Sequence, residues 1–142
     1  MIIESIYEYL SECPILQELS ELKVDFLPKG TCTVSVEPTP TQTINAKYIN
    51  GDSQRQYEFL IATRFDYTDD NAITIDNSGF FERLQSWFEE QTEAGNLPNL
   101  GEGKRAESIE ALSSGYLFNV NENIRDARYQ IQCVLRYYQK GV

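Results

Sequence analysis

Hydrophobic and polar positions alternate most regularly near the end of the chain, in residues 126–140. In this stretch, DARYQIQCVLRYYQK, the apolar side chains from Ala127 to Tyr137 fall on one side. The other side carries mostly amides and guanidiniums, including Arg128 and Arg136. Because successive side chains of a strand point to opposite faces, the pattern predicts a half-buried strand. We expect it to be the last strand of an antiparallel sheet, with its Arg/Gln face toward water or another subunit.

Two segments have the periodicity of an amphipathic helix. In residues 2–13, isoleucines, Leu10 and Cys13 recur at helical spacing, and Pro14 ends the pattern. In residues 79–95, a heavy apolar stripe precedes Gly95, which is a natural residue to follow a helix. The stripe consists of Phe80, Phe81, Leu84, Trp87 and Phe88.

Shorter alternating runs predict strands at 22–26 and 32–36. The Asn50-Gly51 pair is the best hairpin signal in the chain, since both residue types tolerate positive φ. The arm that follows it is long, with apolar side chains sharing one face over residues 57–65. We therefore expect part of this hairpin to project beyond the sheet.

The remaining segments are predicted loops and one further hairpin. Residues 68–77 have the composition of a polar loop, and residues 96–108 that of a Gly- and charge-rich connector. A hairpin is predicted between 113–120 and the C-terminal strand. The order is α-β-β-β-β-α-β-β, an α+β fold in which two helices flank an antiparallel sheet with a long hairpin. We expect residues 1–142 to form a single domain, because neither an internal repeat nor a linker appears in the sequence.

Composition narrows the possible functions. The net charge of -10 argues against binding nucleic acid by phosphate neutralisation. The absence of histidine excludes Ser-His and Cys-His nucleophile pairs and zinc sites built on imidazole. The three cysteines, Cys13, Cys32 and Cys133, contain no CxxC pair, so we expect buried, reduced thiols. The sequence contains no run of about 18 consecutive apolar residues, which is the length that a membrane-spanning helix needs.

Candidate chemistry is weak elsewhere. The GEGK stretch at 101–104 lacks the first glycine and the Ser/Thr of a phosphate loop. The aspartates between residues 66 and 76 miss the spacing of a calcium loop. Tyr137 and Tyr138 could stack on nucleic-acid bases, but the acidic charge argues against it. We predict no catalytic residue, no cofactor and no metal. Binding or structural functions are favoured over the alternative of a carboxylate-based enzyme or small-ligand module.

Several stretches together resemble one family, the minor capsid proteins of tailed bacteriophages of Gram-positive bacteria and their prophages. The similarity covers nearly the whole chain, and its most specific parts are the EPTP segment, the WFEEQ…NLP helix end and the SGYLF…ARYQIQC hairpin. The similar stretches are residues 25–28, 34–44, 47–64, 79–100 and 108–139.

The resemblance implies a protein like the tail terminators, with an antiparallel sheet flanked by helices. Such proteins form a homo-hexameric ring on the tail tube, end its growth and face the head connector or stopper proteins. DNA would pass through the lumen without specific binding, and no membrane would be involved. The resemblance places the protein in the tail or neck of the virion, assembled in the cytoplasm of the bacterial host. The alternative is a head-completion protein that seals the connector.

Candidate interface residues follow from this hypothesis. The hairpin, the 96–106 loop, the acidic end of the second helix and the Arg face of the last strand could all contact neighbouring subunits. The candidate residues are Asn50, Gly51, Arg55, Asp69, Asp70, Glu89, Glu90, Glu93, Lys104, Arg105, Arg128 and Arg136.

Overall fold

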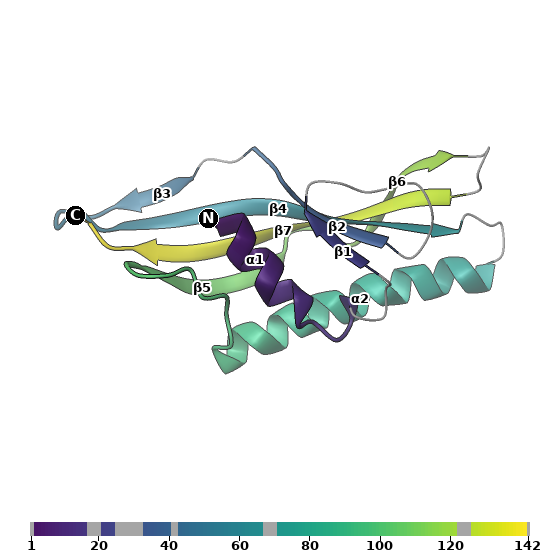
Figure 1. Ribbon diagram of the computed structural model, residues 1–142, viewed down its shortest axis with the longest axis horizontal. Helices are drawn as coiled ribbons and strands as arrows, with labels where there is room; N and C mark the ends of the chain where they lie inside the picture. Colours follow the sequence, from purple (N-terminus) through teal and green to yellow (C-terminus); the bar gives the residue numbers. More distant parts are fainter. Residues whose placement is uncertain are drawn as a thin grey trace.

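The computed structural model describes residues 2–16, 21–24, 33–40, 43–66, 71–121 and 126–141. It confirms the α+β class, with two helices and an antiparallel sheet that contains a long hairpin (Figure 1). The elements are α1 (Ile2–Ser11), β1 (Glu21–Val24), β2 (Thr33–Pro38), β3 (Ile44–Lys47), β4 (Ser53–Asp66), α2 (Asn71–Ala94), β5 (Lys104–Ala111), β6 (Tyr116–Asn121) and β7 (Asp126–Gln139).

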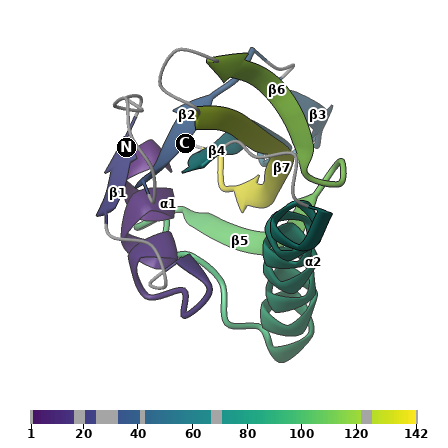
Figure 2. The same ribbon diagram turned by 90° about the vertical axis from the view of Figure 1, so that its right-hand side faces the viewer.

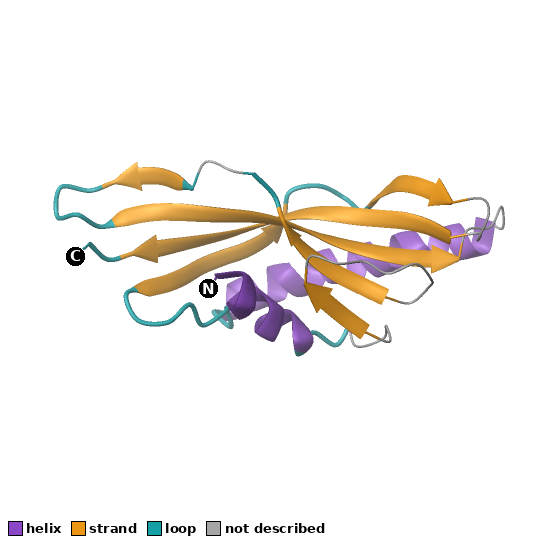
Figure 3. Ribbon diagram, turned by 45° about the horizontal axis from the view of Figure 1, so that its top comes forward, coloured by secondary structure: helices purple, strands orange, loops and turns teal. Residues whose placement is uncertain are grey.

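The sheet is built around the antiparallel pair β4 and β7. Each strand has 14 residues, and they pair from Ser53 with Gln139 to Asp66 with Asp126. Strands β2 and β3 lie one after the other along the outer side of β4, while β5 and β6 do the same along β7. Strand β1 joins β2 in a parallel pair. The sheet is strongly twisted, so its strands overlap in the middle of the view and fan out toward both ends (Figure 3).

This arrangement repeats within the chain. In each half, a helix precedes a strand that pairs with the C-terminal part of a long strand. A short strand then forms a hairpin with the N-terminal part of that long strand. The order α1-β2-β3-β4 therefore has the same topology as α2-β5-β6-β7, although the sequence shows no internal repeat. Strand β1 and the greater length of α2 are the differences.

Both helices pack on the same face of the sheet (Figure 2). Ile6 and Leu10 of α1 and Phe88 of α2 are completely buried there, against Phe59 and Ile131 of the central strands. The predicted stripe of α2 is confirmed, except that Trp87 is only partly buried and packs against Tyr9 in a tilted arrangement with ring centroids 5.2 Å apart. We call this side the covered face and the other side the open face.

Several sequence-based expectations about local structure are wrong. Helix α2 begins at Asn71, so residues 71–77 are helical and not a polar loop. No proline interrupts this segment, and the Gly79 that we took for the start lies inside the helix. The connector predicted at residues 96–108 is partly a strand, because β5 covers Lys104–Ala111. A bulge between Ala106 and Ser108 breaks the two-residue alternation and hides this strand in the sequence.

The place of the long strands also differs from expectation. Strand β7 lies between β4 and β5 and is not the last strand of the sheet. The open face of β7 is only partly exposed to solvent, because Gln130 and Val134 on that face are buried. The β3–β4 hairpin does not project alone, because β4 pairs with β7 along its whole length.

Candidate functional site

Three segments meet at the end of the sheet that carries the β3–β4 turn. We call this end the tip and define it as residues 47–52, 103–105 and 138–141. The C-terminus lies beside the turn (Figure 1). The Lys140 amide donates to the Gly103 carbonyl at 2.8 Å. The backbones of Gly51 and Gly141 are so close that a Cβ on Gly141 would lie 2.6 Å from the carbonyl carbon of Gly51.

Asp52 is the polar centre of the tip. One of its carboxylate oxygens accepts the Gly141 amide at 2.7 Å, and the other accepts hydrogen bonds from the Tyr138 hydroxyl and the Asn50 amide. The pKa of Asp52 is lowered, mainly by the Gly141 amide and then by the Tyr138 hydroxyl. The pKa of Tyr138 is raised, mainly because its hydroxyl donates to Asp52. The carboxylate of Asp52 thus links the turn to Tyr138 and Gly141, and these hydrogen bonds favour its ionised form.

The Asn50-Gly51 turn has the local chemistry that the sequence predicted. Gly51 has φ 92°, a conformation that side chains disfavour. The Asn50 side chain accepts a hydrogen bond from the Asp52 amide at 3.0 Å, and the Gly51 amide donates to the Tyr48 carbonyl at 3.0 Å. These bonds leave the Ile49 side chain fully exposed at the apex.

Aromatic and basic side chains surround Tyr138. The Tyr48 ring stacks on it with centroids 6.0 Å apart, and the Arg105 guanidinium lies 5.6 Å from its centroid. Tyr138 separates two shallow hollows on the surface. One is lined by Lys47, Tyr48, Ile49 and Asn50, and the other by Gly103, Lys104, Arg105 and Lys140.

The tip thus brings four of the candidate interface residues together. They are Asn50, Gly51, Lys104 and Arg105. Arg55, by contrast, lies on the covered face of β4 in register with Tyr137, and its Nε donates to the Ser53 hydroxyl at 2.9 Å. It is half-buried and makes its contacts within its own chain.

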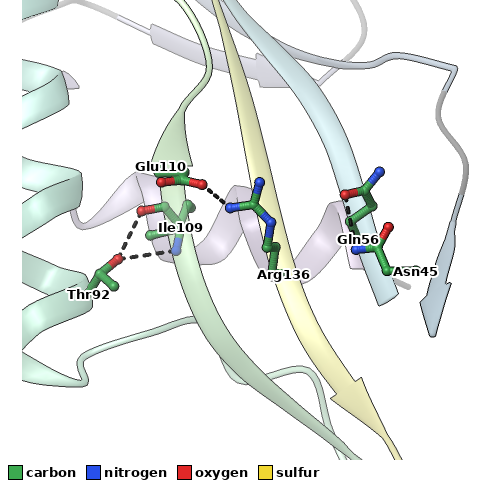
Figure 4. A network of polar contacts seen from close by, with 6 residues as sticks. All are labelled: Asn45, Gln56, Thr92, Ile109, Glu110 and Arg136. Atoms are coloured by element: carbon green, nitrogen blue, oxygen red, sulfur yellow. Dashed lines mark hydrogen bonds and ion pairs between the residues drawn. The ribbon is translucent and has the colours of Figure 1, made fainter. Parts of the chain in front are cut away.

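The acidic end of α2 is a separate surface. Glu89, Glu90 and Glu93 are all exposed there. Between them, Thr92 turns inward, and its hydroxyl donates to the Ile109 carbonyl at 2.9 Å and accepts the Ile109 amide at 3.2 Å (Figure 4). This pair of bonds satisfies polar groups on the outer side of β5, where an open strand edge could otherwise recruit another strand.

The two remaining arginines lie on the open face with partners of their own. Arg128 forms an ion pair with Glu37 at 2.6 Å, and its Nε also donates to Gln130. Arg136 forms an ion pair with Glu110 on the neighbouring strand β5 (Figure 4). The side chain of Arg128 is 16% exposed and that of Arg136 is 40% exposed, so Arg136 is the more accessible of these two candidates. Asp69 and Asp70 lie outside the described residues.

Sequence reasoning missed several members of the tip. Asp52, Tyr48 and Ile49 flank the recognised Asn-Gly pair, and the Tyr137-Tyr138 pair was considered only as a base-stacking candidate. The register of β7 on β4 brings Tyr138 to the hairpin, and the sequence does not specify that register. An Asn-Gly turn followed by Asp is the one local signal that could have identified the centre of the tip.

Metal-ligating groups and cysteine thiols are the remaining candidates for chemistry. The described part of the chain contains no group of three or more acidic or cysteine side chains that could hold a metal ion. Cys13 and Cys133 are buried thiols outside any disulfide, as predicted, and burial raises the pKa of Cys133. Such a thiol is a poor nucleophile because it is rarely ionised. Cys32 lies outside the described residues. Among those residues, no helix is long and apolar enough to cross a membrane.

The fold is similar to that of a chain in the solved structure of a native gene transfer agent virion particle. The two chains superpose with a TM-score of 0.58 at 16% sequence identity. The similarity covers 99% of this chain and 95% of the other. No protein-family model matches the sequence, and no curated protein matches it.

Proposed function

We propose that this protein is a structural component of a virion, and specifically a tail terminator. In this role, a ring of six copies caps the tail tube and joins it to the head connector. The observation that carries the proposal is the similarity over nearly the full length of both chains to a component of a virion particle. The resemblance of the sequence to phage minor capsid proteins points in the same direction. Because folds host many functions, the role at the tail end has to be tested directly.

The chemistry of the surface fits a protein that acts by assembly. Exposed Ile49 and Tyr48 lie at the end of a long hairpin held in place by Asp52. A tube of stacked rings ends in a layer like all the others, so nothing intrinsic stops its growth. A terminator stops growth by matching the tube on one face and refusing another ring on the opposite face. That task requires two different surfaces and closure within a ring. It requires no catalytic residue.

The acidic net charge suits such a ring. DNA that moves through the lumen must not adhere to the wall, and a charge of -10 per chain repels phosphates. The ring would assemble in the cytoplasm of the bacterial host and remain in the neck of the particle.

Deleting the gene from the phage or prophage that encodes it tests the role. We expect DNA-filled heads without tails, beside tails of abnormal length, in negatively stained lysates. Complementation with the intact gene should restore joined particles. Normal free tails beside heads that lose their DNA would contradict the tail-terminator role and favour the head-completion role instead.

A further inference from the structure

Positive charge is concentrated at the tip of an otherwise acidic chain. Four of its 12 basic residues lie there, and they are Lys47, Lys104, Arg105 and Lys140. Within the described residues, none of the three lysines takes part in an ion pair or side-chain hydrogen bond, although Lys140 acts on Asp52 at longer range. The tip therefore carries four cations against one carboxylate, Asp52, and its lysines form no ion pair with the described residues of their own subunit.

The same surface exposes apolar area. The side chain of Ile49 is completely exposed, and that of Tyr48 is exposed by 46%. Exposure of the apolar Ile49 side chain to water does not stabilise the turn, whose own hydrogen bonds are already formed. An apolar apex surrounded by cations favours an occupant that supplies both negative charge and a surface against which the apex can pack.

The acidic end of α2 has the complementary chemistry. Glu89, Glu90 and Glu93 lie in the last two turns of the helix, where the helix dipole is negative as well. Acids at this position oppose the dipole, so they destabilise the helix. They also make the electrostatic potential around the helix end more negative. The last turn contains no basic residue. In the described part of the chain, none of the three glutamates forms an ion pair.

This acidic end is also rigidly placed. The two hydrogen bonds between Thr92 and Ile109 attach it to β5, and the Tyr9 hydroxyl donates to the Asn96 carbonyl just beyond the helix at 2.9 Å. The backbone that carries the three glutamates therefore loses little conformational freedom when the surface binds.

We propose that the tip of one copy docks on the acidic end of α2 in the next copy. The contact joins two different patches, so it is heterologous and can close into a ring. This inference rests on the proposed function, because it identifies the surfaces from which the ring is built. A second copy is favoured over nucleic acid because the net charge of -10 repels a polyanion, whereas a short contact between opposite patches avoids most of that repulsion.

Paired charge reversals test the contact. The tip variant carries Lys47→Glu and Lys104→Glu, and the helix variant carries Glu89→Lys and Glu93→Lys. Sedimentation velocity at about 25 mM and about 500 mM salt measures self-association. We expect the wild type to associate at low salt and to dissociate as salt rises. Each variant alone should associate at least about tenfold more weakly.

The decisive experiment combines the two variants. An equimolar mixture should recover association, because each reversed tip then meets a reversed helix end. A single chain with all four substitutions should recover it too, at the wild-type net charge. The matched control is Glu8→Lys in α1 with Glu12→Lys just beyond the helix, which should have no effect. Thermal melting checks that every variant folds.

Four results would overturn the proposal. The first is a wild type that stays monomeric at low salt, and the second is a helix variant that associates normally. The third is a mixture that fails to recover. The fourth is a tip variant that keeps self-association but loses binding to a short DNA duplex, which would make the tip a nucleic-acid site. The role at the tail is tested in particles, so either idea can fail while the other stands.

Discussion

The middle of the molecule and its tip are held together by different forces. In the middle, two helices cover one face of the sheet, and Phe59, Leu84 and Phe88 are completely buried. At the tip, the strands continue beyond this core, and the closing contacts are hydrogen bonds to Asp52. Ile49 has no protein around it there.

The difference separates the part of the chain that the core stabilises from the part that carries the proposed contact surface. The middle uses its apolar side chains internally, so a substitution there should change stability. The tip is ordered by a few polar bonds and keeps its cations and its apolar apex exposed. A substitution there should change binding while the fold persists.

Phe88→Ala should have the largest effect on stability. It removes a completely buried ring from the core and should cost about 3–5 kcal/mol in the free energy of unfolding. Trp87→Ala is the matched variant, because its larger ring is only partly buried and should cost clearly less. Chemical denaturation measures both. Equal losses of unfolding free energy would mean that Trp87 is as deeply buried as Phe88, which would contradict the structure.

Gly115→Ala should have the next largest effect. An added Cβ would lie 2.2 Å from the Phe81 ring, which is itself in the core, so about 1–3 kcal/mol should be lost. Gly79→Ala is its control inside α2, where the nearest atom is 3.9 Å away. That change should raise stability by up to about 1 kcal/mol, since alanine favours a helix. Two changes in the same direction would contradict the packing of α2.

Gly141→Ala should disturb the tip and leave the middle intact. The new Cβ would lie within 2.8 Å of the Gly51 backbone, so the end of the chain must move away from the turn. We expect faster amide hydrogen exchange at residues 48–52 and 139–141 with little change in melting temperature. Loss of protection throughout β7 would show that tip and middle form one cooperative unit.

The smallest effect should be a pH dependence confined to the tip. The lowered pKa of Asp52 means that its bonds stabilise the tip above the unfolded value of about 3.9 and are lost as pH falls through the folded pKa. The raised pKa of Tyr138 means that its bond is present below about 10 and is lost as pH rises through the folded pKa. The NMR shift of the Gly141 amide should report both transitions. In Asp52→Asn, the acid transition should disappear; its persistence would exclude Asp52 as the cause.

Local patterns predicted much of the fold. The helical period identified α1 and the stripe of α2, and the Asn-Gly pair identified the β3–β4 turn. Strand β5 was missed because its bulge interrupts the alternation. The start of α2 was missed because polar residues precede its stripe. These errors concern local rules that tertiary structure overrides.

The candidate site was predictable only in part. Single features such as Asn50-Gly51 and Lys104-Arg105 were recognised, but their meeting around Tyr138 depends on the register of two long strands. Many registers keep the same apolar face inward, so periodicity alone does not choose among them. The charges of Arg128 and Arg136 were recognised too, yet their partners Glu37 and Glu110 come from neighbouring strands.

The most direct test of the account is an electron-microscopy structure, at side-chain resolution, of the neck of the phage particle whose genome carries this gene. We predict six copies in a closed ring at the head-proximal end of the tail tube, with the tip of each copy on the acidic end of α2 in the next. A ring inside the head connector, or a particle without the protein, would contradict the account.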